Sequence, residues 1–216
     1  IILCTSDRGL CGGFNINLIN KANAFADEHN KNDIDISFTN FGKKGRDWCK
    51  SKKNTIDAEY LGIVGSKFSF SIASSAGNEL VKKYIDGTYD KVIVIYSQFA
   101  GVGKQVPTLK QLLPIPPIEA TQTEEDEEYM AEHICEPSSD VLLNEMLPRN
   151  VYVQIYNALL ETSASEHAAR MTAMDNATNA CTDMVKELQM LFNKARQAAI
   201  TADLMDIVGG AEALKG

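Results

Sequence analysis

The sequence has no apolar run long enough to cross a membrane and no excess of positive charge. None of its hydrophobic runs approaches the roughly 18 residues that a membrane-spanning helix needs. The formal net charge is −8, which argues against a nucleic acid as the main partner. The five cysteines include no CxxC pair, so neither a disulfide framework nor a zinc site is expected. With 44% hydrophobic and 23% charged residues, an ordinary globular chain remains.

Glycine and proline are also missing from one long stretch, between Pro148 and Gly209. All but three of the 14 glycines precede Lys104, and the six prolines run from Pro107 to Pro148. An uninterrupted helix of about 60 residues would be about 90 Å long. We therefore expect two parts, a globular domain at 1–147 and a long C-terminal helix at 148–216. Because Ile1 already lies within an apparent strand, we expect the chain to be a fragment.

The first part alternates between apolar runs and helical spacing. The run Lys91–Ser97 (KVIVIYS) is apolar on both faces, which predicts a central strand. The acidic segment Glu119–Glu128 is expected to be a solvated connector, and 129–136 could return to the sheet. The alternation predicts an α/β fold, a Rossmann-like and mostly parallel sheet. We expect strands at 1–5, 34–41, 91–97 and 105–113, and helices at 14–30, 42–53, 68–85 and 139–147.

The long helix carries a coiled-coil seam without a mate. Apolar or small residues recur in alternating steps of three and four over more than four heptads. A domain of some 150 residues is only about 30–40 Å across, so it cannot cover such a helix. No other segment of the chain is long enough to pair with it, so a missing N-terminal helix or another subunit must do so. The seam positions are Met174, Ala177, Cys181, Met184, Leu188, Leu191, Ala195, Ala198, Ala202 and Met205.

Near its end the helix becomes apolar around most of its circumference. A second stripe runs beside the last seam positions, and a helix of this kind is normally enclosed by other protein. We expect this tip to fit into a sleeve made by other proteins. The tip positions are Ile200, Leu204, Ile207, Ala211 and Leu214.

No residue pattern indicates catalysis. The turn Gly9–Gly13 follows a strand and precedes a helix, but its spacing fits neither nucleotide-binding motif. Cys11 could act as a nucleophile, yet no histidine lies near it in sequence. The three histidines, His29, His133 and His167, are scattered. We therefore expect no catalytic residue, no cofactor and no metal, although a site assembled only in three dimensions stays open.

Several motifs resemble those of one family. Ser6–Asn15 (SDRGLCGGFN) is similar to the glycine-rich signature of the gamma subunit of F-type ATP synthases. The helix segments Glu161–Met171 (ETSASEHAARM) and Ala173–Ala177 (AMDNA) resemble the same family. Asn193–Thr201 (NKARQAAIT), continuing to Ala211, looks like its C-terminal signature. The family's first long helix has no counterpart here, which would explain the unpaired seam. Asp203 stands where the family has glutamate.

The resemblance implies a mechanical role without active-site chemistry. In this family gamma is the central rotor shaft, which couples rotation of the membrane c-ring to ATP synthesis or hydrolysis in the beta subunits. The implied partners are the hexamer of alpha and beta subunits, the epsilon subunit, the c-ring and the missing N-terminal helix. Four polar positions match those that contact the catch loops of the beta subunits, namely Arg196, Gln197, Thr201 and Asp203.

The implied location is peripheral, on the cytoplasmic face of the bacterial inner membrane or the matrix side of the mitochondrial one. Two alternatives stay open at this point. One is a Rossmann-like binding or scaffold module that docks to a partner through its long helix. The other is a small α/β enzyme that uses the glycine-rich turn.

Overall fold

The computed structural model describes residues 1–30, 34–65, 68–116 and 138–214. These residues form two units, Ile1–Thr172 and Ala173–Gly216. The expected acidic connector at 119–128 and the possible strand at 129–136 lie outside the described residues. In chain order, the elements are β1 (Ile2–Cys4), α1 (Phe14–Asn30), β2 (Ser37–Phe41), α2 (Lys43–Lys52), β3 (Thr55–Tyr60), α3 (Phe70–Ile85), β4 (Val92–Gly101), β5 (Lys104–Leu113) and α4 (Ser139–Ala213).

The first unit is built on one five-stranded sheet with the order β3-β2-β1-β4-β5. β1 pairs in parallel with both β2 and β4, so that Ile2 lies opposite Thr39 on one side and Val94 on the other. β2 and β3 are also parallel, whereas β4 and β5 form an antiparallel hairpin. From β1 to β3 the strands are added toward one edge of the sheet, and β4 and β5 are added toward the other, so the order has a switch point between β1 and β4, as in Rossmann-like folds. The predicted α/β fold with a mostly parallel sheet is confirmed.

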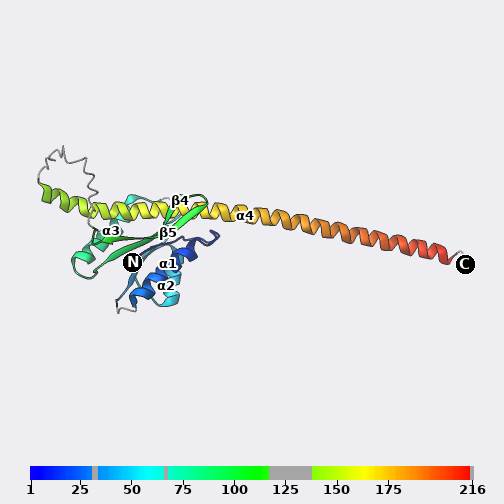
Figure 1. Ribbon diagram of the computed structural model, residues 1–216, viewed down its shortest axis with the longest axis horizontal. Coiled ribbons are helices and arrows are strands. Elements are labelled where there is room, and N and C mark those ends of the chain that lie inside the picture. The colour runs from blue at the N-terminus through cyan, green and yellow to red at the C-terminus, as the bar shows by residue number, and fades with distance from the viewer. Residues whose placement is uncertain (31–33, 66–67, 117–137, 215–216) are drawn as a thin grey trace, which may run out of the picture. The chain divides into compact units, whose positions relative to one another are not determined.

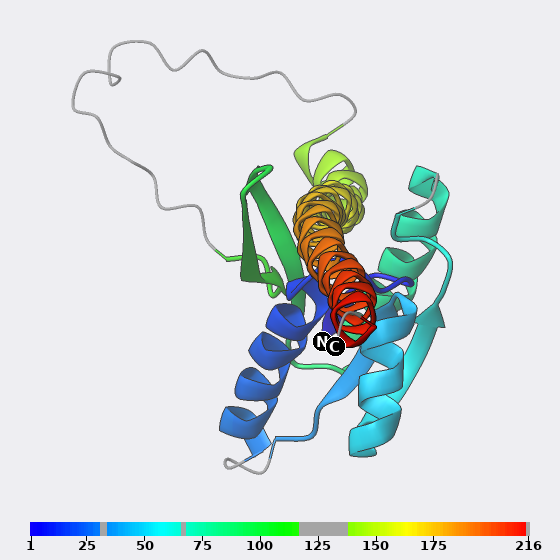
Figure 2. The same ribbon diagram turned by 90° about the vertical axis from the view of Figure 1, so that its right-hand side faces the viewer.

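Helices cover both faces of this sheet. On one face, Leu3 and Ile95 pack with the apolar side of α1, including Phe14 and Leu18. On the other, alternate residues such as Ile2 pack with α3 and the first part of α4. Figure 1 shows α1 and α2 on one side of the strands and α3 with α4 on the other, and Figure 2 separates the same layers from another direction.

The helix α4 begins earlier than the sequence indicated. Its 75 residues start at Ser139, and Pro148 lies inside it instead of marking a boundary. A proline within a helix removes one backbone hydrogen bond and crowds the carbonyl four residues before it. Here the apolar residues that follow compensate, since Val151, Ile155 and Leu159 are buried against the sheet. The short helix expected at 139–147 and the long one therefore form a single element.

Two strands also differ from expectation. β3 was not predicted, because its side chains alternate between exposed and half-buried and it lies at the sheet edge, where no apolar run is needed. β2 begins at Ser37, and Ile34 precedes it as an exposed residue. The alternation of apolar residues is weak in β3 because this strand lies at the sheet edge. At the start of β2 the apolar residue Ile34 is exposed, so it does not mark the strand.

The second unit is helical throughout its described length, and every side chain from Met174 to Leu214 is exposed. It therefore has a continuous apolar surface that no described residue of the chain covers. Among the described residues, no helix combines the length and the apolarity needed to cross a bilayer.

Candidate functional site

The glycine-rich loop after β1 is braced by its own polar side chains. The backbone amide of Ser6 donates to Asn15 Oδ1 at 3.0 Å, and Asn15 Nδ2 lies 2.8 Å from Ser6 Oγ. Asn15 Nδ2 also lies 3.2 Å from Cys11 Sγ. Leu10, at the outer side of the loop, is 76% exposed and has a left-handed backbone with φ of 64°. The loop is thus held in one conformation although its tip is apolar and exposed.

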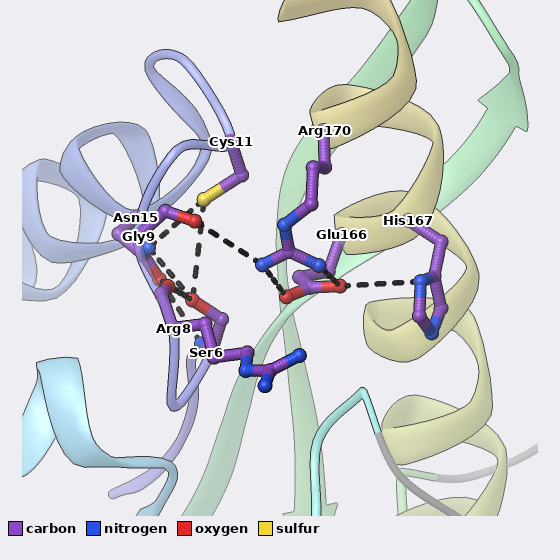
Figure 3. Close-up of polar contacts among 8 residues, drawn as sticks. All are labelled: Ser6, Arg8, Gly9, Cys11, Asn15, Glu166, His167 and Arg170. Atoms are coloured by element: carbon purple, nitrogen blue, oxygen red, sulfur yellow. Dashed lines mark hydrogen bonds and ion pairs between the residues drawn. The ribbon is translucent and has the colours of Figure 1, made fainter. Parts of the chain in front are cut away.

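A buried ion pair on α4 faces this loop. Glu166 is only 1% exposed, and its carboxylate accepts two hydrogen bonds from Arg170, one turn further along the helix. Arg170 Nη2 also donates to the carbonyl oxygen of Gly9 at 3.2 Å. Figure 3 shows both side chains reaching from α4 toward the loop. The hydrogen bond to Glu166 raises the pKa of Arg170, which therefore stays charged.

Gly65 completes the pocket around this carboxylate. Its backbone has a φ of 82°, and a Cβ atom there would lie 3.3 Å from Glu166 Oε2. His167 is mostly exposed, with Nδ1 3.7 Å from the same oxygen. Glu166 is therefore surrounded by one guanidinium, one imidazole and a glycine backbone, an arrangement that pairs the buried charge.

The loop lies where a Rossmann-like fold would bind a ligand, at the carboxyl end of β1 beside the reversal of strand order. Here that position is faced by Arg170 and Glu166, whose contacts are to the protein itself. The geometry thus explains the loop as a structural junction within the first unit.

The other residues considered for chemistry have structural surroundings. Cys11 is 2% exposed, and its thiol contacts the side chains of Ser6 and Asn15, neither of which is a base. His29 stacks on Phe25, and its Nδ1 lies 2.9 Å from the carbonyl oxygen of that residue. His133 lies outside the described residues. Within the part of the chain that the structure describes, no group of His, Cys, Asp or Glu could hold a metal ion.

Two further glycines have structural explanations. Gly42, directly before α2, has a φ of 103°, and a Cβ there would lie 2.1 Å from the carbonyl oxygen of Thr5, so only glycine fits. Gly101 pairs with Lys104 where the hairpin turn joins β4 to β5. Both glycines are explained by close approach or by a turn.

The seam and tip positions all lie on the second unit and are all exposed. Within this unit their large apolar side chains form an exposed surface, with exposed fractions from 38% at Met174 to 90% at Leu214. Val185 and Phe192, which the sequence reasoning left out, are similarly exposed and widen this surface. Nothing described in the chain covers these residues.

The four predicted catch-loop residues also lie on the second unit. Arg196, Gln197 and Asp203 are exposed, as is Thr201, whose Oγ1 donates to the carbonyl oxygen of Gln197 at 2.9 Å. Thr201 thus bonds to the helix backbone, and the side chains of all four residues lie on the exposed surface of the helix. They are available to an external partner.

Comparison with known proteins identifies the family. The family model described as ATP synthase matches residues 1–214. The ATP synthase gamma chain of Desulfosudis oleivorans is 61% identical over 220 residues, which cover 100% of this chain and 74% of the relative. The chain belongs to the ATP synthase gamma-chain family. A gamma chain of Nitratidesulfovibrio vulgaris is 49% identical, and the match covers 100% of this chain and 73% of that relative.

Solved structures agree with this membership. A chain from the central stalk and c-ring structure of the Tetrahymena thermophila mitochondrial ATP synthase matches with a TM-score of 0.63 and 26% identity, covering 82% of this chain and 75% of that one. A chain of the Euglena gracilis mitochondrial ATP synthase matches with a TM-score of 0.71 and 20% identity, covering 99% of this chain and 71% of that one. At this identity the match supports the fold alone.

Membership of the gamma-chain family confirms the predicted identity and the predicted function as the rotor subunit of ATP synthase. The chain is a non-catalytic, peripheral component of the catalytic sector of that complex. The alternative of a free binding or scaffold module is not better supported by these comparisons.

Sequence reasoning missed the contact between Arg170 and Gly9. The pair Glu166 and Arg170 is visible in sequence as opposite charges four residues apart on a helix. Such spacing is common on exposed helix surfaces, however, and it does not reveal that the carboxylate is buried or that the guanidinium reaches a loop 161 residues earlier.

Proposed function

We propose that the helical second unit of this gamma chain is the shaft that turns inside the ring of alpha and beta subunits. The observation that carries this proposal is the unbroken exposure of the apolar helix from Met174 to Leu214. Each large apolar side chain left in water forgoes about 1.5–3 kcal/mol of burial, so the seam and the tip together favour enclosure strongly.

The seam and the tip have different roles in this proposal. The seam, Met174 to Met205, pairs with a second helix in a coiled coil, because its spacing gives one apolar stripe. The tip residues from Ile200 to Leu214 contact a sleeve formed by the surrounding subunits. Apolar contacts are non-directional, so they permit rotation with little change in energy from one angle to the next.

The polar residues beside the tip provide the directional contacts. Arg196, Gln197, Thr201 and Asp203 bind the catch loops of the beta subunits through hydrogen bonds, and those with a charged partner are the stronger. Such bonds favour particular angles of the shaft. Asp203 places its carboxylate one methylene closer to the backbone than glutamate would, so its partner must approach correspondingly closer.

The first unit forms the base of the rotor in this proposal. Its partners there are the epsilon subunit and the c-ring, as the central stalk and c-ring description of the Tetrahymena relative supports. The complex lies on the cytoplasmic face of a bacterial inner membrane, which the bacterial origin of the gamma chains compared above supports.

The catch-loop assignment is tested by changing Arg196→Ala together with Gln197→Ala in the ATP synthase that contains this chain. We expect lower ATP hydrolysis or weaker coupling to proton pumping in membrane vesicles, with the thermal stability of the isolated chain unchanged. Asn193→Ala with Lys194→Ala, exposed polar residues one turn earlier, is the matched control. Turnover and coupling equal to those of the control would exclude these two residues from the contact.

A further inference from the structure

The first unit holds α4 through two kinds of contact. Over its earlier turns the helix packs by apolar side chains, with Val151, Ile155 and Leu159 almost wholly buried against the sheet and α3. Such contacts resist separation of the helix from the sheet. They also oppose rotation of the helix about its own axis, because rotation would expose these buried side chains, but they lack the directional preference of hydrogen bonds.

The last turns of α4 within this unit carry polar contacts to the second half of β4. Ser165 Oγ donates to the carbonyl oxygen of Ser97 at 3.1 Å, and both residues are buried. The backbone amide of Ser97 donates to Thr162 Oγ1 at 3.4 Å. The amide of Phe99 donates to Glu161 Oε2, also at 3.4 Å. Hydrogen bonds weaken steeply with angle, so these three contacts fix the rotational position of the helix.

Arg170 adds a fourth contact, on a different segment of the chain. Its guanidinium reaches the carbonyl oxygen of Gly9 while it pairs with the buried Glu166 (Figure 3). Gly9 belongs to the loop after β1, whereas Ser97 and Phe99 belong to β4. The helix is therefore held by the second half of β4 and by the loop that follows the neighbouring parallel strand β1, which resists rotation more effectively than contacts to one segment.

Stability alone does not account for a charged pair at this position. A buried ion pair is often no more stabilising than apolar residues of the same volume, because both charges lose their hydration. An apolar pair would also lack a donor for the carbonyl oxygen of Gly9. What the observed pair adds is a directional, bidentate geometry that an apolar contact does not have.

We propose that Glu161, Thr162, Ser165, Glu166 and Arg170 form a torque-bearing joint that makes α4 and the sheet turn as one body. The inference rests on the proposed shaft function and adds to it the place where torque passes between the helix and the base. The joint lies at the last turns of α4 within the first unit, which ends at Thr172. Torque carried along the helix therefore meets these residues first.

The test compares variants in the ATP synthase complex that contains this chain, reconstituted in vesicles. Arg170→Ala removes the contact to Gly9, and Ser165→Ala removes a single hydroxyl from the contact to Ser97. The control is Lys186→Ala, which breaks an exposed pair with Asp183 that ties the helix only to itself. ATP hydrolysis and ATP-driven proton pumping are measured on the same vesicles, and amide exchange is followed at Ser6 and Phe14, whose amides are hydrogen-bonded within the loop.

We expect both joint variants to hydrolyse ATP at the rate of the control while pumping fewer protons per ATP. In Arg170→Ala, the loss of a bond to a charged group accelerates loop exchange by about ten- to hundredfold. Arg170→Lys keeps the charge but not the planar fork, so it gives an intermediate loss of pumping. It also tests the joint if the alanine variant does not assemble.

The proposed joint would be refuted if Arg170→Lys and Ser165→Ala pumped protons at the level of the control while the unmodified complex was fully coupled. The proposed shaft function would then remain intact. If the unmodified chain instead fails to support coupled pumping in the complex, the proposed function itself is wrong.

Discussion

The packing of α4 on α3 depends on one glycine, and replacing it gives a sharp test of the fold. Gly77 lies on the buried side of α3. A Cβ atom at this position would lie 2.4 Å from Tyr152 Cδ1, 3.0 Å from Tyr152 Cε1 and 3.3 Å from Ile155 Cδ1. The Gly77→Ala variant must therefore displace the tyrosine ring or separate the two helices.

Two effects of opposite sign determine how much the Gly77→Ala change lowers the free energy of unfolding. Alanine is favoured over glycine within a helix by about 1 kcal/mol. Overpacking a well-filled core costs about 1–3 kcal/mol, and a 2.4 Å approach to a rigid ring belongs at the upper end of that range. We expect a net loss of about 1–2 kcal/mol, which for a chain of this size corresponds to a decrease of about 2–8 °C in Tm.

The assay is thermal and urea unfolding of the 216-residue chain, followed by circular dichroism. Gly103→Ala is the matched control, because a Cβ there meets nothing within 4 Å and the residue lies in a hairpin turn. Combining Gly77→Ala with Tyr152→Ala should destabilise by less than the sum of the two single changes, since the second removes the ring that the first strikes. A Gly77→Ala chain as stable as the original would show that α3 and α4 are not packed as described.

Three further predictions concern charge, thiols and the exposed helix. Burial raises the pKa of Asp57, but hydrogen bonds from Lys83 and Tyr89 outweigh burial and hold it below the usual value. The stability that Asp57 adds is present above about pH 4 and is lost as the pH falls through the lowered pKa, so Lys83→Met should flatten the decline in Tm between about pH 5 and pH 3. An unchanged profile would contradict this. In a Cys135→Ser background, iodoacetamide should label Cys181 rapidly and the buried Cys4, Cys11 and Cys49 only after unfolding, and fast labelling of a second thiol in mass spectrometry would be the opposite result. The isolated chain should self-associate or fray along Met174–Leu214; a monomer in sedimentation whose amides are fully protected there would refute this.

Most of the first unit could be predicted from the sequence because its elements have strong local signals. The apolar run at 91–97 lies within β4, and the helical spacing at 14–30 coincides with α1. The basic segment at 42–53 contains α2, since its turn requires Gly42 and its helix follows directly. In each case the residues that mark the element follow one another closely in the sequence.

What the sequence did not reveal depends on contacts between distant residues. The helix α4 continues past Pro148 because the burial of Val151 and Ile155 stabilises it. No local pattern before the proline indicates this burial. The joint at Glu166 and Arg170 likewise depends on a loop near the other end of the chain. For the seam, the tip and the catch-loop residues, the structure gives exposure but no partner, so their roles stay predictions.

The exposure of the second unit also bears on its susceptibility to proteolysis. The segment from Met174 to Thr182 is rich in weak helix formers such as Asp175, Asn176 and Thr178, and no described tertiary contact supports it. Helices without such support open readily, and open backbone is what proteases cleave. Chains in which this helix has not met its partners should therefore be cleaved within it faster than assembled ones.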